Sequence, residues 1–127
     1  MRAILDTNML IEKSFEHTGY ELAVSSLSYA ELGFGVRMAP TPVERARREA
    51  EFRAIRDFFG VGVPFDDAAA AAYETVCGLV LEQGRKVRGR TIDLMIAATA
   101  AAHGAVVLTR NTDDFLGLEG FVTVLSP

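Results

Sequence analysis

Acidic residues lie next to the predicted junctions between strands and helices, where loops from different strands converge. They are Asp6, Glu31, Asp93, Asp113 and Asp114. Like charges a few ångströms apart raise one another's pKa unless a cation lies between them. Ligation by oxygen atoms alone suits hard ions such as Mg²⁺ or Mn²⁺, which activate a water molecule and stabilise charge on a phosphoryl oxygen. No spacing of histidine and cysteine predicts zinc.

Each acid also has a local explanation. Glu31 follows Ser28 at the spacing of a capping box, in which it would only satisfy the start of a helix. Asp93 follows Thr91, a predicted N-cap, and could interact with the helix dipole. Asp6 could form an Asx-type turn, and the two adjacent aspartates could cap a short turn. Four such coincidences at converging junctions are less economical than one shared site.

The spacing of apolar residues predicts the elements that would position these acids. Short apolar runs bounded by turn residues predict five buried strands, at residues 3–5, 22–25, 61–63, 105–108 and 121–125. Helical patterns between them predict helices at residues 29–38, 42–59, 68–83 and 92–102. Strands that alternate with helices indicate a parallel sheet covered by helices on both faces. Binding and catalytic residues of such sheets lie at the carboxyl ends of the strands.

Length and composition indicate one ordinary globular domain over residues 1–127. Hydrophobic residues make up 50% and charged residues 24%, which excludes a disordered tail protein. The single cysteine, Cys77, cannot form an internal disulfide, so we expect a reducing compartment. No apolar run is long enough for a membrane span, and an acid at position 6 comes too early for a signal peptide. We therefore expect a cytoplasmic protein.

The charge of the chain is unevenly distributed. The formal net charge is −4, yet residues 37–56 hold six arginines against three glutamates. A second basic segment, residues 85–90, contains no acid. Its basic residues are Arg85, Lys86, Arg88 and Arg90. Each segment could be a solvated helix face or loop, but two basic segments on an acidic body indicate two kinds of surface.

Four segments of the chain resemble a known family. They are ILDTN at residues 4–8, SSLSYAELGFG at 25–35, DLMIAATA at 93–100 and LTRNTDDF at 108–115. Each is weak by itself, but together, in this order, they resemble PIN-domain ribonucleases. The similarity is greatest to the VapC toxins of bacterial toxin–antitoxin pairs. It implies a three-layer α/β/α sandwich around a parallel sheet of about five strands.

The resemblance implies roles for individual residues. Asp6, Glu31 and Asp93 match the acidic metal-site positions of the family. Many relatives have a fourth aspartate where this chain has Asn111, whereas others have an acid three residues later, here Asp114. We expect Asp114 to be the fourth acid, with the aspartate before it as the second choice. The polar residues expected to support the site are Asn8, Thr109, Asn111 and Asp113.

The resemblance also implies an activity and partners. The activity is Mg²⁺- or Mn²⁺-dependent hydrolysis of RNA phosphodiester bonds. Asp6, Asp93 and Asp114 would hold one or two ions, and Glu31 would bind a second ion or orient the attacking water. The basic rim expected to attract RNA consists of Arg85, Lys86, Arg88 and Arg90. The family further implies a homodimer and a VapB-like antitoxin that enters a groove near residues 37–56.

Two other functions are compatible with parts of the sequence. A strand followed by aspartate also begins phosphatases of the haloacid dehalogenase type. Those enzymes need a second aspartate two residues later, where this chain has Asn8, and a suitable downstream lysine. The other alternative is a catalytically silent PIN-like module that binds protein or RNA, and Asn111 in place of an acid leaves room for it.

Overall fold

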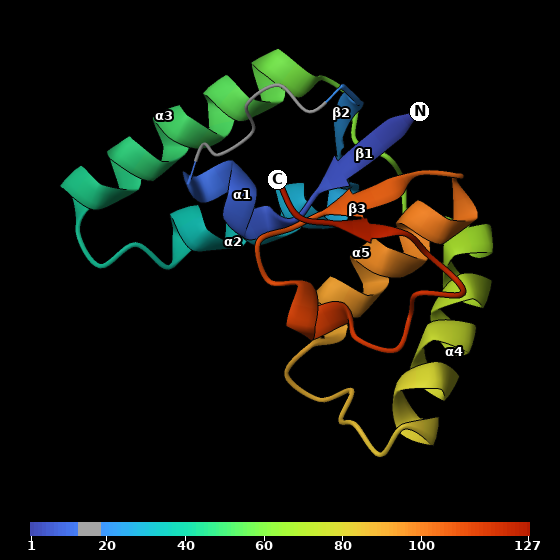
Figure 1. The fold of residues 1–127 in the computed structure, drawn as a ribbon. Helices are drawn as coiled ribbons and strands as arrows, with labels where there is room; N and C mark the ends of the chain where they lie inside the picture. Colours follow the sequence, from blue (N-terminus) through green and yellow to red (C-terminus); the bar gives the residue numbers. More distant parts are fainter. Residues whose placement is uncertain (13–18) are drawn as a thin grey trace.

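The computed structural model describes residues 1–12 and 19–127, and their centre is a parallel sheet (Figure 1). Its strands, in the spatial order β2-β1-β3-β4, are Glu21–Val24, Arg2–Leu5, Val106–Leu108 and Val124–Leu125. All three strand pairs are parallel. Parallel pairing needs a crossover between successive strands, so the carboxyl ends of all four strands lie at one edge of the sheet.

The described residues form four strands, so the expected count of about five is wrong by one. The predicted strand at residues 61–63 is reduced to an isolated bridge between Ser25 and Val63. Val61 is 98% exposed, and only Val63 of this run is buried. Pro64 follows it and cannot donate a backbone hydrogen bond, so the pairing does not continue.

Five α-helices and one 3₁₀-helix of the described residues surround the sheet. The α-helices are α1 (Thr7–Glu12), α2 (Ser26–Arg37), α3 (Pro42–Phe59), α4 (Asp67–Glu82) and α5 (Thr91–Ala102). The 3₁₀-helix is η1 (Thr112–Phe115). The sequence predicted α3 and α4 closely, because Thr41 and Asp66 cap them as local signals. It did not predict α1, which has six residues.

Two predicted helix starts are wrong. Ser25, not Ser28, is the N-cap of α2, because the Ser25 side chain accepts a hydrogen bond from the backbone N–H of Leu27. The capping box proposed for Glu31 is therefore absent from this helix, whose residues are all described. Thr91 is the first residue of α5 rather than its cap, which leaves Asp93 in the first turn.

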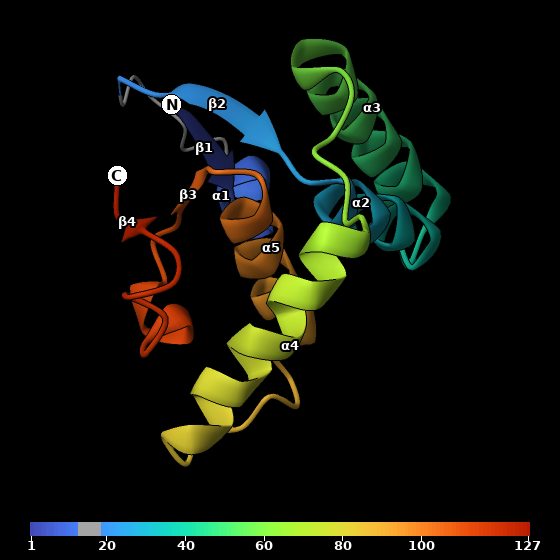
Figure 2. The same ribbon diagram turned by 90° about the vertical axis from the view of Figure 1, so that its right-hand side faces the viewer.

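The sheet is buried on both faces. Ile4 and Val107 point to the face covered by α5, and α4 packs on α5 (Figure 2). Their neighbours Leu5 and Leu108 point to the opposite face, with residues of α1, α2 and α3. Burial on both faces explains why the strands are continuous apolar runs rather than alternating ones. The resulting three layers confirm the predicted α/β/α sandwich.

The helices α2 and α3 form an arm beside the sheet (Figures 1 and 2). The hydroxyl of Tyr29 on α2 donates to the backbone oxygen of Gly60, directly after α3. The guanidinium of Arg56 lies over the rings of Tyr29 and Phe52. None of the helices in the described residues is long and apolar enough to span a membrane.

Replacing Gly62 by alanine tests how tightly the start of α2 is held. A Cβ at this position would lie 2.9 Å from the backbone nitrogen of Ser26. We expect the variant to lose about 1–3 kcal/mol of unfolding free energy, because backbone must shift. Gly78→Ala is the matched control, since a Cβ there meets nothing within 4 Å in mid-helix. It should gain about 0.5–1 kcal/mol. Equal urea midpoints for both variants would contradict this packing.

Candidate active site

Asp6 lies at the carboxyl end of the central strand and is 4% exposed. Its backbone N–H donates to the oxygen of Leu108 at the end of β3, which joins the two strand ends. Its Oδ1 accepts from the backbone N–H of Asn8 at 2.6 Å. Its Oδ2 accepts from the hydroxyl of Thr109 at 2.5 Å. The predicted Asx-type turn is thus present, and it orients a carboxylate that also faces the groove.

A chain of hydrogen bonds joins the buried hydroxyl groups of Ser28 and Thr7 to the Glu31 carboxylate. The hydroxyl of Thr7 donates to Oε1 of Glu31 at 2.6 Å. The Thr7 oxygen also lies 2.8 Å from the hydroxyl oxygen of Ser28. Because a threonine hydroxyl carries one proton and gives it to Glu31, Ser28 is the donor in the second bond. The role of Thr7 is not predictable from the sequence, and Ser28 is not the helix cap that the sequence predicts, because no local pattern indicates contact between α1 and α2.

Asp93 lies in the first turn of α5, where its surroundings disfavour the charged form of its carboxyl group. Its pKa is raised to about 6, and burial is the largest cause. The next causes, in order, are the negative charges of Asp6, Asp114 and Glu31. The positive charge of Arg90 lowers the pKa and offsets these effects only in part. The structure therefore brings together four acids that the sequence singled out, from four separate segments.

The fourth acid lies on η1, which follows β3. Asp114 is half-buried and is among the charges that raise the pKa of Asp93, whereas Asp113 is exposed and is not. The backbone N–H of Asn111 donates to the Thr109 hydroxyl at 3.0 Å, and that of Asp114 to the Asn111 oxygen at 3.0 Å. This chain of contacts connects η1 to Asp6 and supports Asp114 over Asp113.

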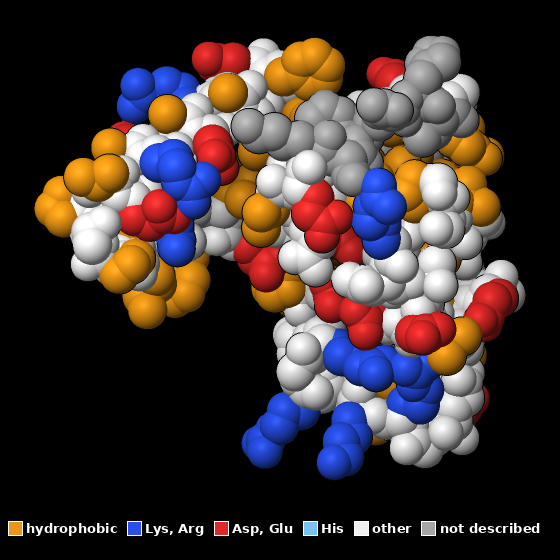
Figure 3. All heavy atoms as spheres, turned by 60° about the vertical axis from the view of Figure 1, so that its left-hand side comes forward, with side chains coloured by type: hydrophobic (Ala, Val, Ile, Leu, Met, Phe, Trp, Pro, Cys, Tyr) orange, Lys and Arg blue, Asp and Glu red, His pale blue; other side chains and the backbone are white. Residues whose placement is uncertain are grey.

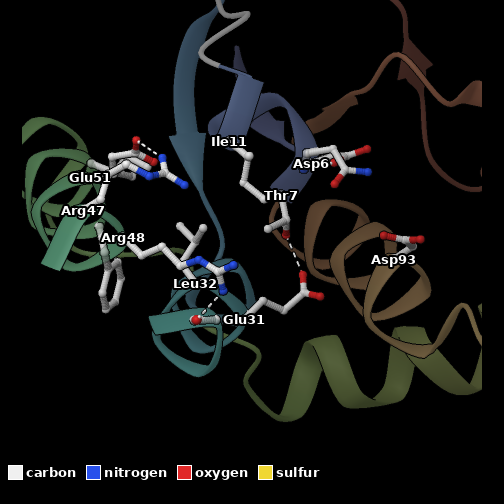
Figure 4. A pocket seen from close by; sticks show the side chains of 13 residues that line it. Asp6, Thr7, Ile11, Glu31, Leu32, Arg47, Arg48, Glu51 and Asp93 are labelled. Carbon is white, nitrogen blue, oxygen red and sulfur yellow. Dashed lines mark hydrogen bonds and ion pairs between the residues drawn. The ribbon is translucent and has the colours of Figure 1, made fainter. Parts of the chain in front are cut away.

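Asp6, Glu31 and Asp93 open into a groove of about 810 Å³ between the body and the α2–α3 arm, whereas Asp114 is not one of its lining residues (Figure 4). Figure 4 shows Asp6, Glu31 and Asp93 around one space. The lining residues are Asp6, Thr7, Asn8, Ile11, Glu31, Leu32, Gly35, Arg47, Arg48, Glu51, Phe52, Ile55 and Asp93. In Figure 3 acidic side chains gather in this hollow, with basic side chains on the arm and below. The groove is thus acidic at the sheet and mixed along α3.

Two arginines of α3, Arg47 and Arg48, line the arm side of the groove, although the sequence does not predict them as site residues. Arg48 donates to the backbone oxygen of Gly35 at 2.8 Å and forms an ion pair with Glu44. Arg47 forms an ion pair with Glu51 at 2.7 Å. Their charges are therefore already paired along the helix, as is typical of a helix at i, i+4 spacing.

The donor set fits a hydrated divalent ion. Among residues 1–12 and 19–127, no three acidic, histidine or cysteine side chains are close enough to enclose an ion as they stand. Mg²⁺ commonly keeps several waters and binds through one or two carboxylates, so a closed cage is not required. The negative charges of neighbouring acids contribute to the raised pKa of Asp93, and a bound cation would reduce this repulsion.

The four basic residues of the predicted RNA-binding rim differ in their surroundings. Lys86 and Arg88 are exposed in the turn before α5. Arg85 donates to backbone oxygens of the η1 region, and Arg90 approaches the backbone oxygen of Asp114 at 3.5 Å. RNA binding by this rim stays a prediction, and Lys86 with Arg88 are the members whose side chains are open to solvent.

Comparison with known proteins agrees with this architecture. The family model described as PIN domain matches residues 3–119, and the chain belongs to that family. Within it, the chain is similar to proteins named VapC ribonucleases. It is 33% identical over 120 residues to Ribonuclease VapC4 of Mycobacterium tuberculosis, covering 88% of each chain. It is 37% identical over 103 residues to Ribonuclease VapC5 of the same organism, covering 81% of this chain and 73% of that protein.

Solved structures show the same likeness. The fold matches VapBC-5 of Mycobacterium tuberculosis, described as a member of the VapBC family of toxin–antitoxin systems, with a TM-score of 0.79 and 33% identity. The match covers 98% of this chain and 96% of the other. FitAcB of Neisseria gonorrhoeae matches with a TM-score of 0.79 and 26% identity, covering 98% and 96%. These findings confirm the predicted family and fold class.

The raised pKa of Asp93 predicts a pH-dependent stability of the metal-free protein. The folded state keeps a proton on Asp93 that the unfolded chain loses, so stability falls as pH rises from about 4 to about 6. With chelator at pH 7.5, Asp93→Asn should be more stable than wild type by about 1 kcal/mol after solvent screening is allowed for. At pH 4 the difference should vanish.

Glu74→Gln, an exposed change on α4, is the control for this experiment. It should leave the pH dependence of thermal unfolding as in wild type. A metal-free Asp93→Asn variant that is less stable than wild type at pH 7.5 would contradict the prediction that the charged Asp93 side chain destabilises the folded state.

Thr7→Val tests the buried hydroxyl chain. The change preserves side-chain shape but leaves the Ser28 hydroxyl and one oxygen of Glu31 without their partner. We expect a loss of about 1–2 kcal/mol in the free energy of unfolding by urea. Thr7→Ser keeps the hydroxyl and should retain most of that energy. Equal losses in both variants would mean that packing of the methyl group, not the hydrogen bonds, is what counts.

Proposed function

We propose that this protein is a Mg²⁺- or Mn²⁺-dependent endoribonuclease that acts as the toxin of a VapBC-type toxin–antitoxin pair. The observation that carries the proposal is the convergence of Asp6, Glu31 and Asp93 from three elements on one groove, where burial and the charges of neighbouring acids raise the pKa of Asp93. The names of its relatives support the same reading, since two of them are named as VapC ribonucleases at 33% and 37% identity.

Asp6, Asp93 and Asp114 are the residues that would hold one or two ions, with Glu31 at a second ion or beside the attacking water. When bound, such an ion activates water and stabilises negative charge on the phosphoryl oxygens. The side chain of Asp6 is held in one orientation by Thr109 and the Asn8 N–H, so little reorganisation is needed.

Glu31 is suited to orient water because only one of its oxygens is used by Thr7. Oε1 accepts a hydrogen bond from the Thr7 hydroxyl, which fixes the direction of the carboxylate. Oε2 is then the oxygen that accepts a proton from a water molecule in the groove. Exposed Lys86 and Arg88 would contact RNA phosphates, which gives salt-dependent affinity without sequence choice.

The same proposal includes partners. One solved structure with this fold, VapBC-5, is described as a member of the VapBC family of toxin–antitoxin systems. We propose a VapB-like antitoxin that binds the groove between the body and the α2–α3 arm, and a homodimer as the assembled toxin. The acidic end and the apolar side chains of Phe52 and Ile55 in this groove suit a segment with apolar residues and a basic side chain.

The experiment is cleavage of total cellular RNA by the purified protein with Mg²⁺, with Mn²⁺ and with chelator. Asp6→Asn, Glu31→Gln, Asp93→Asn and Asp114→Asn are compared with wild type. We expect discrete fragments that require the ion, and a loss of about 100-fold or more in Asp6→Asn and Asp93→Asn. Asp113→Asn is the matched control for Asp114→Asn and should retain most of the activity.

Circular dichroism and Mn²⁺ titration accompany each variant. Cleavage that persists in chelator or in folded Asp6→Asn would overturn the proposal. No cleavage, together with Mn²⁺ binding no tighter in wild type than in Asp6→Asn, would instead support a catalytically silent PIN-like module.

A further inference from the structure

The loop between α4 and α5 is joined to the segment that carries Asp114. Nη1 of Arg85 donates to the backbone oxygen of Leu116 at 3.1 Å, and Nη2 donates to that of Asp113 at 2.8 Å. Nε2 of Gln83 donates to the backbone oxygen of Gly117 at 3.1 Å. The loop and η1 are far apart in the sequence, so these bonds are a tertiary contact rather than a local turn.

The two bonds of Arg85 lie on either side of the fourth acid. One acceptor directly precedes Asp114, and the other belongs to Leu116, two residues after it. A guanidinium is a planar fork with donors in fixed directions, so two bonds fix the relative position of both carbonyl groups. Within η1, the N–H of Leu116 reaches the Asp113 oxygen only at 3.4 Å. Arg85 is therefore the closer partner of that oxygen.

The backbone of Asp114 has two further contacts, from its N–H to the Asn111 oxygen at 3.0 Å and from Arg90 to its own oxygen at 3.5 Å, but neither spans the residues on both sides of it. Phe115 and Leu118 are buried in the core and fix the depth of the segment. Gly117 has a φ of 90° and continues the chain through a turn. Phe115 points into the core, so its neighbour Asp114 is aimed by the backbone of a four-residue 3₁₀-helix. The contact of Arg85 with the backbone on both sides of Asp114 therefore controls where the Asp114 carboxylate points.

We propose that Arg85 is a positioning residue, which holds η1 so that the Asp114 carboxylate faces Asp93, and that it is not one of the RNA phosphate contacts. The proposal rests on the proposed function for the role of Asp114. The proposal gives different roles to different residues of the basic segment 85–90. Arg85 stabilises the acidic site through the backbone, while exposed Lys86 and Arg88 face solvent.

The test compares Arg85→Ala, Arg85→Lys and the matched control Arg88→Ala. Mn²⁺ affinity is measured by calorimetry with the metal alone, and kcat, KM and the salt dependence of KM are measured with RNA. We expect Arg85→Ala to lower Mn²⁺ affinity and kcat by about tenfold or more, with KM and its salt dependence near wild type. Arg85→Lys should not rescue, because one ammonium group lacks the fork that spans two carbonyls.

Arg88→Ala should show the opposite pattern. It should raise KM and reduce the salt dependence by about one phosphate contact, while Mn²⁺ affinity stays unchanged. If Arg85→Ala behaves in this way and Arg85→Lys restores binding, Arg85 is a phosphate contact and the proposal is overturned. Wild-type values for Arg85→Ala in every measurement would overturn it as well.

Hydrogen exchange of residues 111–118 in the metal-free protein separates this proposal from the proposed function. We expect faster exchange there in Arg85→Ala and in Arg85→Lys than in Arg88→Ala, with the rest of the sheet unchanged. Equal exchange in all three variants would overturn the proposal even if the enzyme is active. A wild-type protein that neither cleaves RNA nor binds Mn²⁺ would contradict the proposed function, and the exchange result would still report on the contact.

Discussion

Repulsion among carboxylates is the constraint on which the rest of this structure depends. Asp93 is half-buried near three other acids, and burial together with their negative charges raises its pKa. A chain holds such groups together only if other contacts fix them. Here the hydroxyl of Thr109 holds Asp6, and the hydroxyl of Thr7 holds Glu31. The parallel sheet brings the anchoring points together, since its strands all end at one edge.

The division of the groove follows from the three-layer architecture. The sheet end and α5 supply Asp6 and Asp93, while the α2–α3 arm supplies Glu31 and the side chains along α3. Glu31 is therefore the acid that connects the two halves. The hydrogen bond between Glu31 and Thr7 joins α2 to α1. It therefore holds the arm in place relative to the sheet at the point where the acids meet.

Local signals account for what the sequence predicted well. Thr41 followed by proline fixed the start of α3, and Asp66 fixed that of α4, because capping involves neighbours in the chain. The acids at strand ends were also predictable, because each directly follows, or lies a few residues after, an apolar run that is visible in the sequence. The strand at residues 61–63 was overpredicted, because its apolar pattern does not reveal that Val61 is exposed. The contacts of Thr7 and Arg85 join segments distant in sequence, which no local pattern encodes.

The burial pattern of α3 has a consequence for how such proteins diverge. All eighteen residues of α3 are described, and none of them is buried. Exposed positions generally tolerate substitution within about 0.5 kcal/mol, so most of this helix can change without loss of the fold. The acids lie on other elements and are shielded from such drift. The surface of α3 can therefore diverge between copies of such a gene while the arrangement of acids at the sheet edge stays the same.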